Sequence, residues 1–124
     1  MLRIAVVAAA ALTGAAVSAY AGDQGDPGQD CGVSTPEMVE CLNAKTAQWD
    51  KRLNAAYKSA LDAAPGKRRE QLRVAQRLWV QYRDANCTYY FMGEGSIARV
   101  EAAGCTYRMT KARALELEGK EDRD

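Results

Sequence analysis

The sequence predicts an all-α protein, a small three-helix bundle stapled by two disulfides. Three observations lead to this class. Apolar residues recur at helical spacing over long stretches, and no alternating β-branched run is present. The segments Ala64-Pro65-Gly66 and Phe91-Met92-Gly93-Glu94-Gly95 break this pattern twice. The four cysteines form an even set, and a chain of 124 residues is enough for one domain.

The first 21 residues have the layout of a secretory signal peptide. A short positive start, Met1 to Arg3, precedes an almost wholly apolar stretch over residues 4–17, and Ala19-Tyr20-Ala21 places small residues before a cleavage point. We expect cleavage after Ala21. The apolar stretch is short for a transmembrane helix, so no transmembrane anchor is expected after cleavage. The predicted location is periplasmic or secreted.

Composition narrows the classes of function. Once Arg3 is removed, sixteen basic and sixteen acidic side chains remain, and a neutral chain has no overall attraction to nucleic acid. The sequence contains no histidine. This excludes catalysis by a Ser–His or Cys–His pair, and the commonest metal ligand is absent. The sequence contains no Cys-x-x-Cys pair, the spacing that is typical of a zinc site. We therefore expect a protein that is not an enzyme and that has no cofactor.

The first helix is predicted after a flexible leader over residues 22–33. Ser34 and Glu37 have capping-box spacing; alternatively, Thr35 is the cap and Pro36 is the first helical residue. The helix should end near Asp62, before the Pro-Gly stop.

A second helix is expected from about Lys67 to Tyr90. Ser96 then caps a third helix that runs to about Glu118. The helical domain therefore covers residues 34–118, and residues 119–124 form a charged tail. Four cysteines allow three pairings. We favour Cys31–Cys41 and Cys87–Cys105, because each closes a local segment at a helix end; pairing Cys41 with Cys87 or Cys105 is the alternative.

Projection at ~100° per residue gives each helix an expected core face. In the first helix the face holds Met38, Leu42, Trp49, Leu53, Ala56 and Ala60. In the second it holds Leu72, Ala75, Trp79, Tyr82 and Tyr90. In the third, where Lys111 interrupts it, it holds Ile97, Val100, Tyr107, Ala114 and Leu115.

Polar residues also project into the core face of the second helix. A guanidinium there needs a partner, and we expect Arg83 to pair with Asp50 of the first helix. Asn54 and Gln76 would complete a structural polar network. The alternative interpretation is a polar groove, rimmed by Trp49, Trp79 and Tyr57, that receives a ligand.

Two surfaces are candidates for binding. A Cys87–Cys105 disulfide would present a rigid aromatic loop suited to a partner's cleft, although these aromatics could instead fold back onto the core. The candidate binding surface comprises Tyr57, Trp79, Tyr89, Tyr90, Phe91, Glu94 and Ser96. A basic patch at the start of the second helix could attract cell-wall polymer, or it is a solvated helix face. It comprises Lys67, Arg68, Arg69, Arg73 and Arg77.

The order of several motifs resembles the lysozyme inhibitor LprI-like family of bacterial secreted proteins. The motifs are Cys41, Asp50-x-x-Leu53-Asn54-x-x-Tyr57, and Leu72-x-x-Ala75-Gln76-x-x-Trp79-x-x-x-Arg83-Asp84-x-x-Cys87, followed by Gly95-Ser96, Cys105, Thr110 and Arg113. The resemblance covers roughly residues 31–117. The resemblance implies a helical, disulfide-bonded, exported protein with lysozyme as its protein partner.

Overall fold

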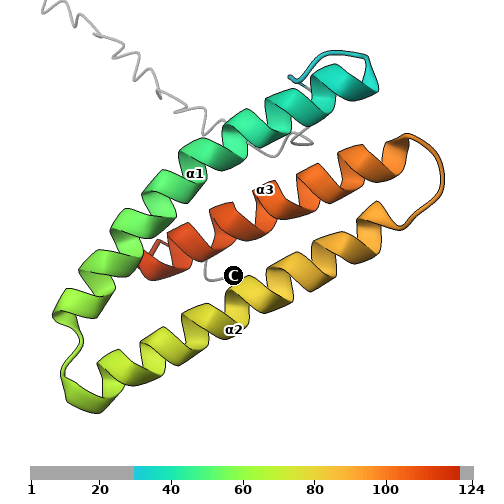
Figure 1. The fold of residues 1–124 in the computed structure, drawn as a ribbon. Helices are drawn as coiled ribbons and strands as arrows, with labels where there is room; N and C mark the ends of the chain where they lie inside the picture. The colour runs from blue at the N-terminus through green and yellow to red at the C-terminus, as the bar shows by residue number, and fades with distance from the viewer. Residues whose placement is uncertain (1–29, 121–124) are drawn as a thin grey trace, which may run out of the picture.

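The computed structural model describes residues 30–120 and contains three helices in that range. These are α1 (Thr35–Ala63), α2 (Gly66–Phe91) and α3 (Ile97–Leu117), and the described part contains no strand. Successive helices run in opposite directions, with α3 between the other two in Figure 1. The predicted all-α bundle is confirmed. The predicted signal peptide, residues 22–29 of the leader and residues 121–124 of the tail lie outside the described residues.

The start of α1 confirms the predicted capping box. The hydroxyl of Ser34 accepts a hydrogen bond from the amide of Glu37, and the Glu37 carboxylate accepts one from the amide of Ser34 at 3.0 Å. This second bond, with a further one from the Ser34 hydroxyl, lowers the pKa of Glu37. Of the two predicted caps, Ser34 is therefore the one that the chain uses.

The expected side-chain cap of α3 is not formed. Ser96 precedes the first helical residue, but its own backbone is already helical, with φ −70° and ψ −24°, and its side chain makes no capping bond. A capping hydroxyl reaches the first-turn amides from an extended backbone, which explains the difference. The Ser96 hydroxyl instead accepts a hydrogen bond of 3.5 Å from Thr35 at the start of α1.

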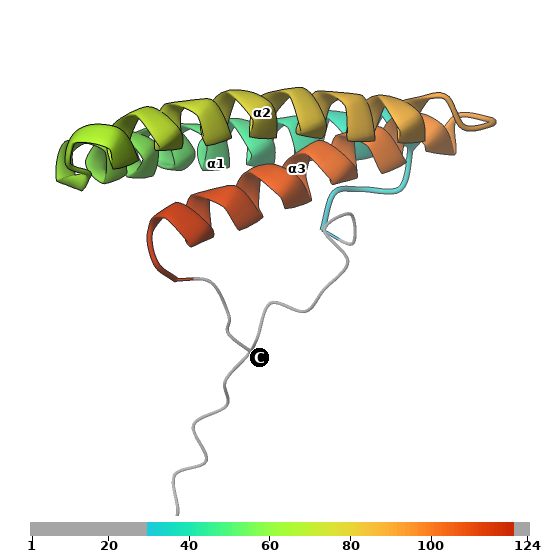
Figure 2. The same cartoon turned by 90° about the horizontal axis from the view of Figure 1, so that it is seen from below.

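The three helices are packed unequally. Both α1 and α2 lie against α3, and they touch each other only slightly. In Figure 2 α1 lies behind α2, and α3 lies below both. The core cluster lies between α1 and α3 and contains Cys31, Leu42, Ala103 and Tyr107. The predicted core face of α1 is confirmed by Leu42 and by two further buried residues, Leu53 and Ala56.

Lys111, which interrupts the core face of α3, lies beside this cluster. Its amine stands 5.6 Å from the centre of the Trp49 ring and 5.9 Å from that of Tyr107. A cation over an aromatic face is attracted by the ring's quadrupole, and the aliphatic stem of lysine can cover apolar surface. The residue therefore fits the core edge without breaking the helix.

Three expected core positions are wrong. Tyr82 and Tyr90 of α2 are 62% and 36% exposed, and Ile97 of α3 is 52% exposed. In α2, only Cys87 is buried. Because α3 is the one helix that α2 packs against closely, a narrow strip of α2 is covered, and Tyr82 lies on the side that points away.

The favoured disulfide pairing is confirmed. Cys31 pairs with Cys41, ten residues away, and holds the segment before α1 against that helix. Cys87 pairs with Cys105, eighteen residues away, and joins the end of α2 to the middle of α3.

None of the three helices combines the length and apolar character needed to span a bilayer.

Candidate functional site

The four residues of the expected polar network are divided among three separate contacts. On α1, the Asn54 amide donates to the Asp50 carboxylate at 3.4 Å. Gln76 of α2 accepts a hydrogen bond of 3.0 Å from the guanidinium of Arg113 on α3. Arg83 pairs with its neighbour Asp84, with 2.9 Å between Nη2 and Oδ1.

The expected Arg83–Asp50 pair is therefore wrong. The two residues are on helices that hardly touch, and Arg83 pairs within its own helix instead. The guanidinium of Arg83 lies along its own helix, 5.2 Å from the centre of the Trp79 ring. Trp79 is thereby partly covered by Arg83, while Gln76 and Arg113 link α2 to α3.

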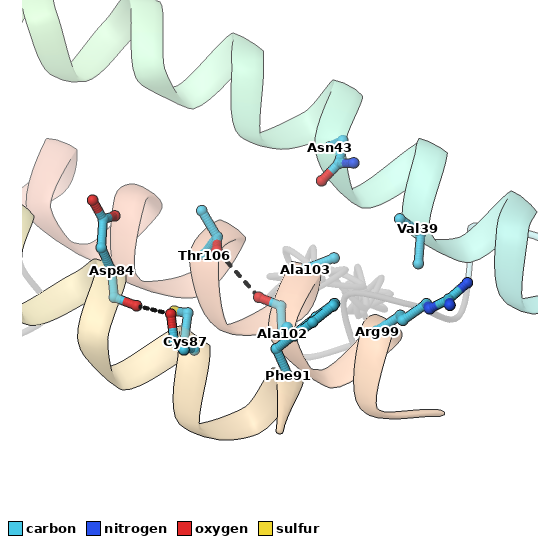
Figure 3. Close-up of a pocket in the computed structure, with 10 residues that line it drawn as sticks. Val39, Asn43, Asp84, Cys87, Phe91, Arg99, Ala102, Ala103 and Thr106 are labelled. Atoms are coloured by element: carbon cyan, nitrogen blue, oxygen red, sulfur yellow. Dashed lines mark hydrogen bonds between the residues drawn. The ribbon is translucent and has the colours of Figure 1, made fainter. Parts of the chain in front are cut away.

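The separation of α1 from α2 leaves a groove, the α1–α2 groove, with α3 as its floor. Its main section has a volume of about 470 Å³ and is shown in Figure 3. Val39 and Asn43 form one wall, and Asp84 and Phe91 stand on the other. Ala102, Ala103 and Thr106 supply the floor, and Arg99 lies near the start of α3.

Two further hollows lie beside the main section. One, of about 390 Å³, shares Val39, Asn43 and Arg99 with it and extends to the start of α1. The other, of about 420 Å³, is lined by Tyr57 of α1 and by Gln76, Arg77, Val80 and Gln81 of α2. Tyr57 and Gln76 thus line a hollow between α1 and α2. The sequence analysis missed Asn43 and Arg99, because helical spacing does not reveal that α1 and α2 stand apart.

The end of the α2–α3 hairpin carries the other candidate surface. We define the hairpin tip as residues 90–97. Tyr90, Phe91, Met92 and Ile97 are all exposed there, and the aromatic rings do not fold onto the core. Figure 2 shows this loop reaching past the beginning of α1. The tip therefore presents apolar side chains at one extremity of the molecule.

The turn within the tip depends on its glycines. Gly95 has a φ of +73°, in the left-handed region that glycine enters at low cost. A Cβ at Gly93 would stand 3.2 Å from the carbonyl oxygen of Tyr90, so the close turn also favours glycine there. Cys87 fixes the helix one turn before the tip through its disulfide to α3. The tip is thus a short loop held from both sides.

The remaining residues of the candidate binding surface are spread over the molecule. Tyr89 precedes the tip, is highly exposed, and its ring makes an edge-to-face contact with that of Tyr90 at 5.4 Å. Glu94 and Ser96 are exposed within the tip. Tyr57 lies elsewhere, in a hollow beside the main section of the α1–α2 groove. Trp79 also lies elsewhere, beneath the guanidinium of Arg83. The structure therefore brings Tyr89, Tyr90, Phe91, Glu94 and Ser96 together.

The basic residues at the start of α2 have different environments. Arg69 donates to the carbonyl oxygens of Leu61 and Asp62, and so caps the end of α1. Arg73 pairs with Glu70 one turn away. Lys67, Arg68 and Arg77 complete the set and are exposed.

In residues 30–120 no group of three side chains suited to hold a metal ion occurs.

Fold and surface together define a small, disulfide-stapled helical module with an apolar tip and an open groove. The profile of the family described as "Lysozyme inhibitor LprI" matches residues 29–117, and the chain belongs to that family. An uncharacterized protein of Rhizobium meliloti (strain 1021) is 29% identical over 108 residues, which cover 73% of this chain and 78% of that protein. No solved structure matches the chain significantly.

Proposed function

We propose that the protein is an exported binding protein that inhibits lysozyme by direct protein–protein contact, and that it is not an enzyme. Membership of the LprI family supports an inhibitory role. The two disulfides are typical of an oxidising compartment outside the cytoplasm. The sequence of the first 21 residues supports export.

The hairpin tip is the proposed contact with lysozyme. The observation that carries this assignment is the exposure of Phe91 and Met92, 59% and 79%, at the end of a hairpin that a disulfide closes. Large apolar side chains supply much of the binding energy at protein interfaces. A loop that is ordered before binding loses less conformational entropy in the complex.

The α1–α2 groove extends this surface, because Phe91 is part of both. Phe91 lines the main section of the groove, and Arg99 marks its end near the tip. A partner that covers the tip would therefore also contact the groove wall. In such a complex, Phe91 would lie at the apolar centre of the interface. The amide of Asn43 and the guanidinium of Arg99 would be available around it for hydrogen bonds to the partner.

A lysozyme assay on bacterial cell walls tests the proposal. The purified, oxidised protein should slow the fall in turbidity of a cell-wall suspension, and reduced, alkylated protein should not, because reduction releases the hairpin. Animal-type, goose-type and phage-type lysozymes would be compared. If the oxidised protein leaves all three at full activity at micromolar concentration, the proposed function is wrong.

The alternative function is a cell-wall interaction module that uses the basic patch. Its support is weakened by Arg69 and Arg73, which are engaged in intramolecular bonds. Lys67, Arg68 and Arg77 would have to supply the attraction to an anionic polymer. Neutralising these three residues should abolish co-sedimentation with isolated cell walls if this alternative is correct.

A further inference from the structure

The outer side of α2 carries an apolar stripe that neither α1 nor α3 covers. We define the α2 stripe as Val74, Leu78, Tyr82, Ala85 and Tyr89. All five residues are exposed, and Leu78, Tyr82 and Tyr89 are more than half exposed. Their steps of four, four, three and four residues keep them on one helical face. A continuous apolar stripe of this kind marks an interaction surface.

We propose that the α2 stripe pairs with the same stripe of a second copy, with the two α2 helices antiparallel. The stripe is nearly symmetric about Tyr82, with Leu78 and Val74 before it and Ala85 and Tyr89 after it. A two-fold axis close to Tyr82 would therefore place Val74 opposite Tyr89 and Leu78 opposite Ala85. Such self-complementarity is what a two-fold interface requires.

The charges on α2 favour this occupant and this orientation. Lys67, Arg68, Arg69, Arg73 and Arg77 lie in the first half of the helix, where Glu70 is the one acidic residue. Parallel pairing would bring these cations together, whereas antiparallel pairing separates them. Antiparallel pairing also brings Arg77 of each copy within about one helical turn of Asp84 of the other, a gap that an arginine side chain spans.

In the single chain, the side chains of Arg77 and Asp84 are accessible for an ion pair with a second copy. Both flank the stripe on the side nearer the α1–α2 groove, and both are exposed. Within the described residues Arg77 forms no ion pair, and the Asp84 carboxylate is 63% exposed beside Arg83. The two-fold axis would produce the Arg77–Asp84 pair twice. The hairpin tips, residues 90–97, would lie at opposite ends of the paired helices.

Sedimentation equilibrium of the oxidised protein, from micromolar to millimolar concentration, tests the pairing. We expect a mass that rises toward twice that of a single chain. Leu78→Lys should weaken the dimer about a hundredfold or more, because the change acts once in each copy. Ala47→Lys, which adds the same charge at an exposed position of α1, should leave the dissociation constant unchanged. Far-ultraviolet circular dichroism would verify that each variant remains helical.

A charge reversal tests the antiparallel geometry. Arg77→Asp and Asp84→Arg should each raise the dissociation constant of the dimer, and the double variant should restore it, because the two signs are exchanged across the axis. A monomeric mass throughout the concentration range would overturn the proposal. So would a dimer that is insensitive to Leu78→Lys. If Leu78→Lys instead disrupts a complex with lysozyme while the protein alone is monomeric, the stripe binds lysozyme and the proposed self-pairing is wrong.

Discussion

Gln76 on α2 accepts a hydrogen bond from the guanidinium of Arg113 on α3, with 3.0 Å between Oε1 and Nε. The Arg113 side chain is only 10% exposed and pairs also with Glu116 in its own helix, at 2.6 Å. The Cys87–Cys105 disulfide joins α2 to α3 near the hairpin tip, and this hydrogen bond joins them farther along. Gln76 therefore fixes how α2 lies on α3.

Replacing Gln76 by alanine should lower the free energy of unfolding by about 1–3 kcal/mol, because the buried charge of Arg113 loses an acceptor. Urea denaturation would measure the change. Gln81→Ala, at an exposed position of the same helix, is the matched control and should change stability by less than about 0.5 kcal/mol. Equal effects of the two substitutions would contradict the assigned role of Gln76.

Thr110 of α3 is fully buried, and its hydroxyl has no hydrogen-bond partner among the described residues. Valine has nearly the same shape and carries no polar group. Thr110→Val should therefore leave the protein as stable or raise the free energy of unfolding by about 1 kcal/mol. Thr106→Val is a useful comparison, since the Thr106 hydroxyl donates to the Ala102 carbonyl at 3.1 Å. A loss of stability in Thr110→Val would contradict this, because it would mean that the Thr110 hydroxyl makes a stabilising hydrogen bond in the folded protein.

The two disulfides should differ in their effect on inhibition. Replacing Cys87 and Cys105 together by alanine should remove about 3 kcal/mol of stability, as expected for a loop of this length, and should abolish lysozyme inhibition. Replacing Cys31 and Cys41 together should also destabilise the protein. It should leave inhibition intact at temperatures where the variant is folded, because this disulfide does not hold the hairpin. Inhibition that survives loss of Cys87–Cys105 would argue against a pre-ordered tip.

The ion pair between Arg52 of α1 and Glu118, just after α3, predicts a stability change in acid. Hydrogen bonds from Arg52, the shorter at 2.6 Å, lower the pKa of Glu118 from 4.5 to about 2. Because the pKa is lower in the folded protein, the pair stabilises it above pH 4.5, and this contribution falls as the pH drops toward 2. The difference in Tm between the native protein and Glu118→Gln should therefore be largest at neutral pH and vanish near pH 2. A difference that is constant with pH would contradict this.

Local features of the sequence were sufficient to predict the helices and their covalent links. The capping residues Ser34 and Glu37 lie three positions apart, and the Pro65-Gly66 break is equally local. Disulfides between cysteines ten and eighteen residues apart also follow from local geometry. Such features depend on residues that are neighbours along the chain, which is why they can be inferred without knowledge of the packing.

The arrangement of the helices was harder to predict. Periodicity groups Tyr82 with other apolar residues of α2, but it does not tell which side of the helix meets a neighbour. The same limit explains the wrong Arg83–Asp50 pair, because it assumes contact between α1 and α2. The α1–α2 groove follows from that missing contact, so Asn43 and Arg99 could be recognised as its lining only from the three-dimensional structure.

The most direct test of the proposed function compares two apolar residues of equal exposure. Phe91 at the hairpin tip and Leu78 in the α2 stripe are each 59% exposed, so a charge at either position costs the fold little. Phe91→Asp and Leu78→Asp would be assayed side by side for inhibition of lysozyme in the turbidity assay. We expect Phe91→Asp to raise the concentration needed for half-inhibition at least about tenfold, and Leu78→Asp to leave it unchanged. Full inhibition by Phe91→Asp would contradict the assignment of the hairpin tip as the surface that binds lysozyme.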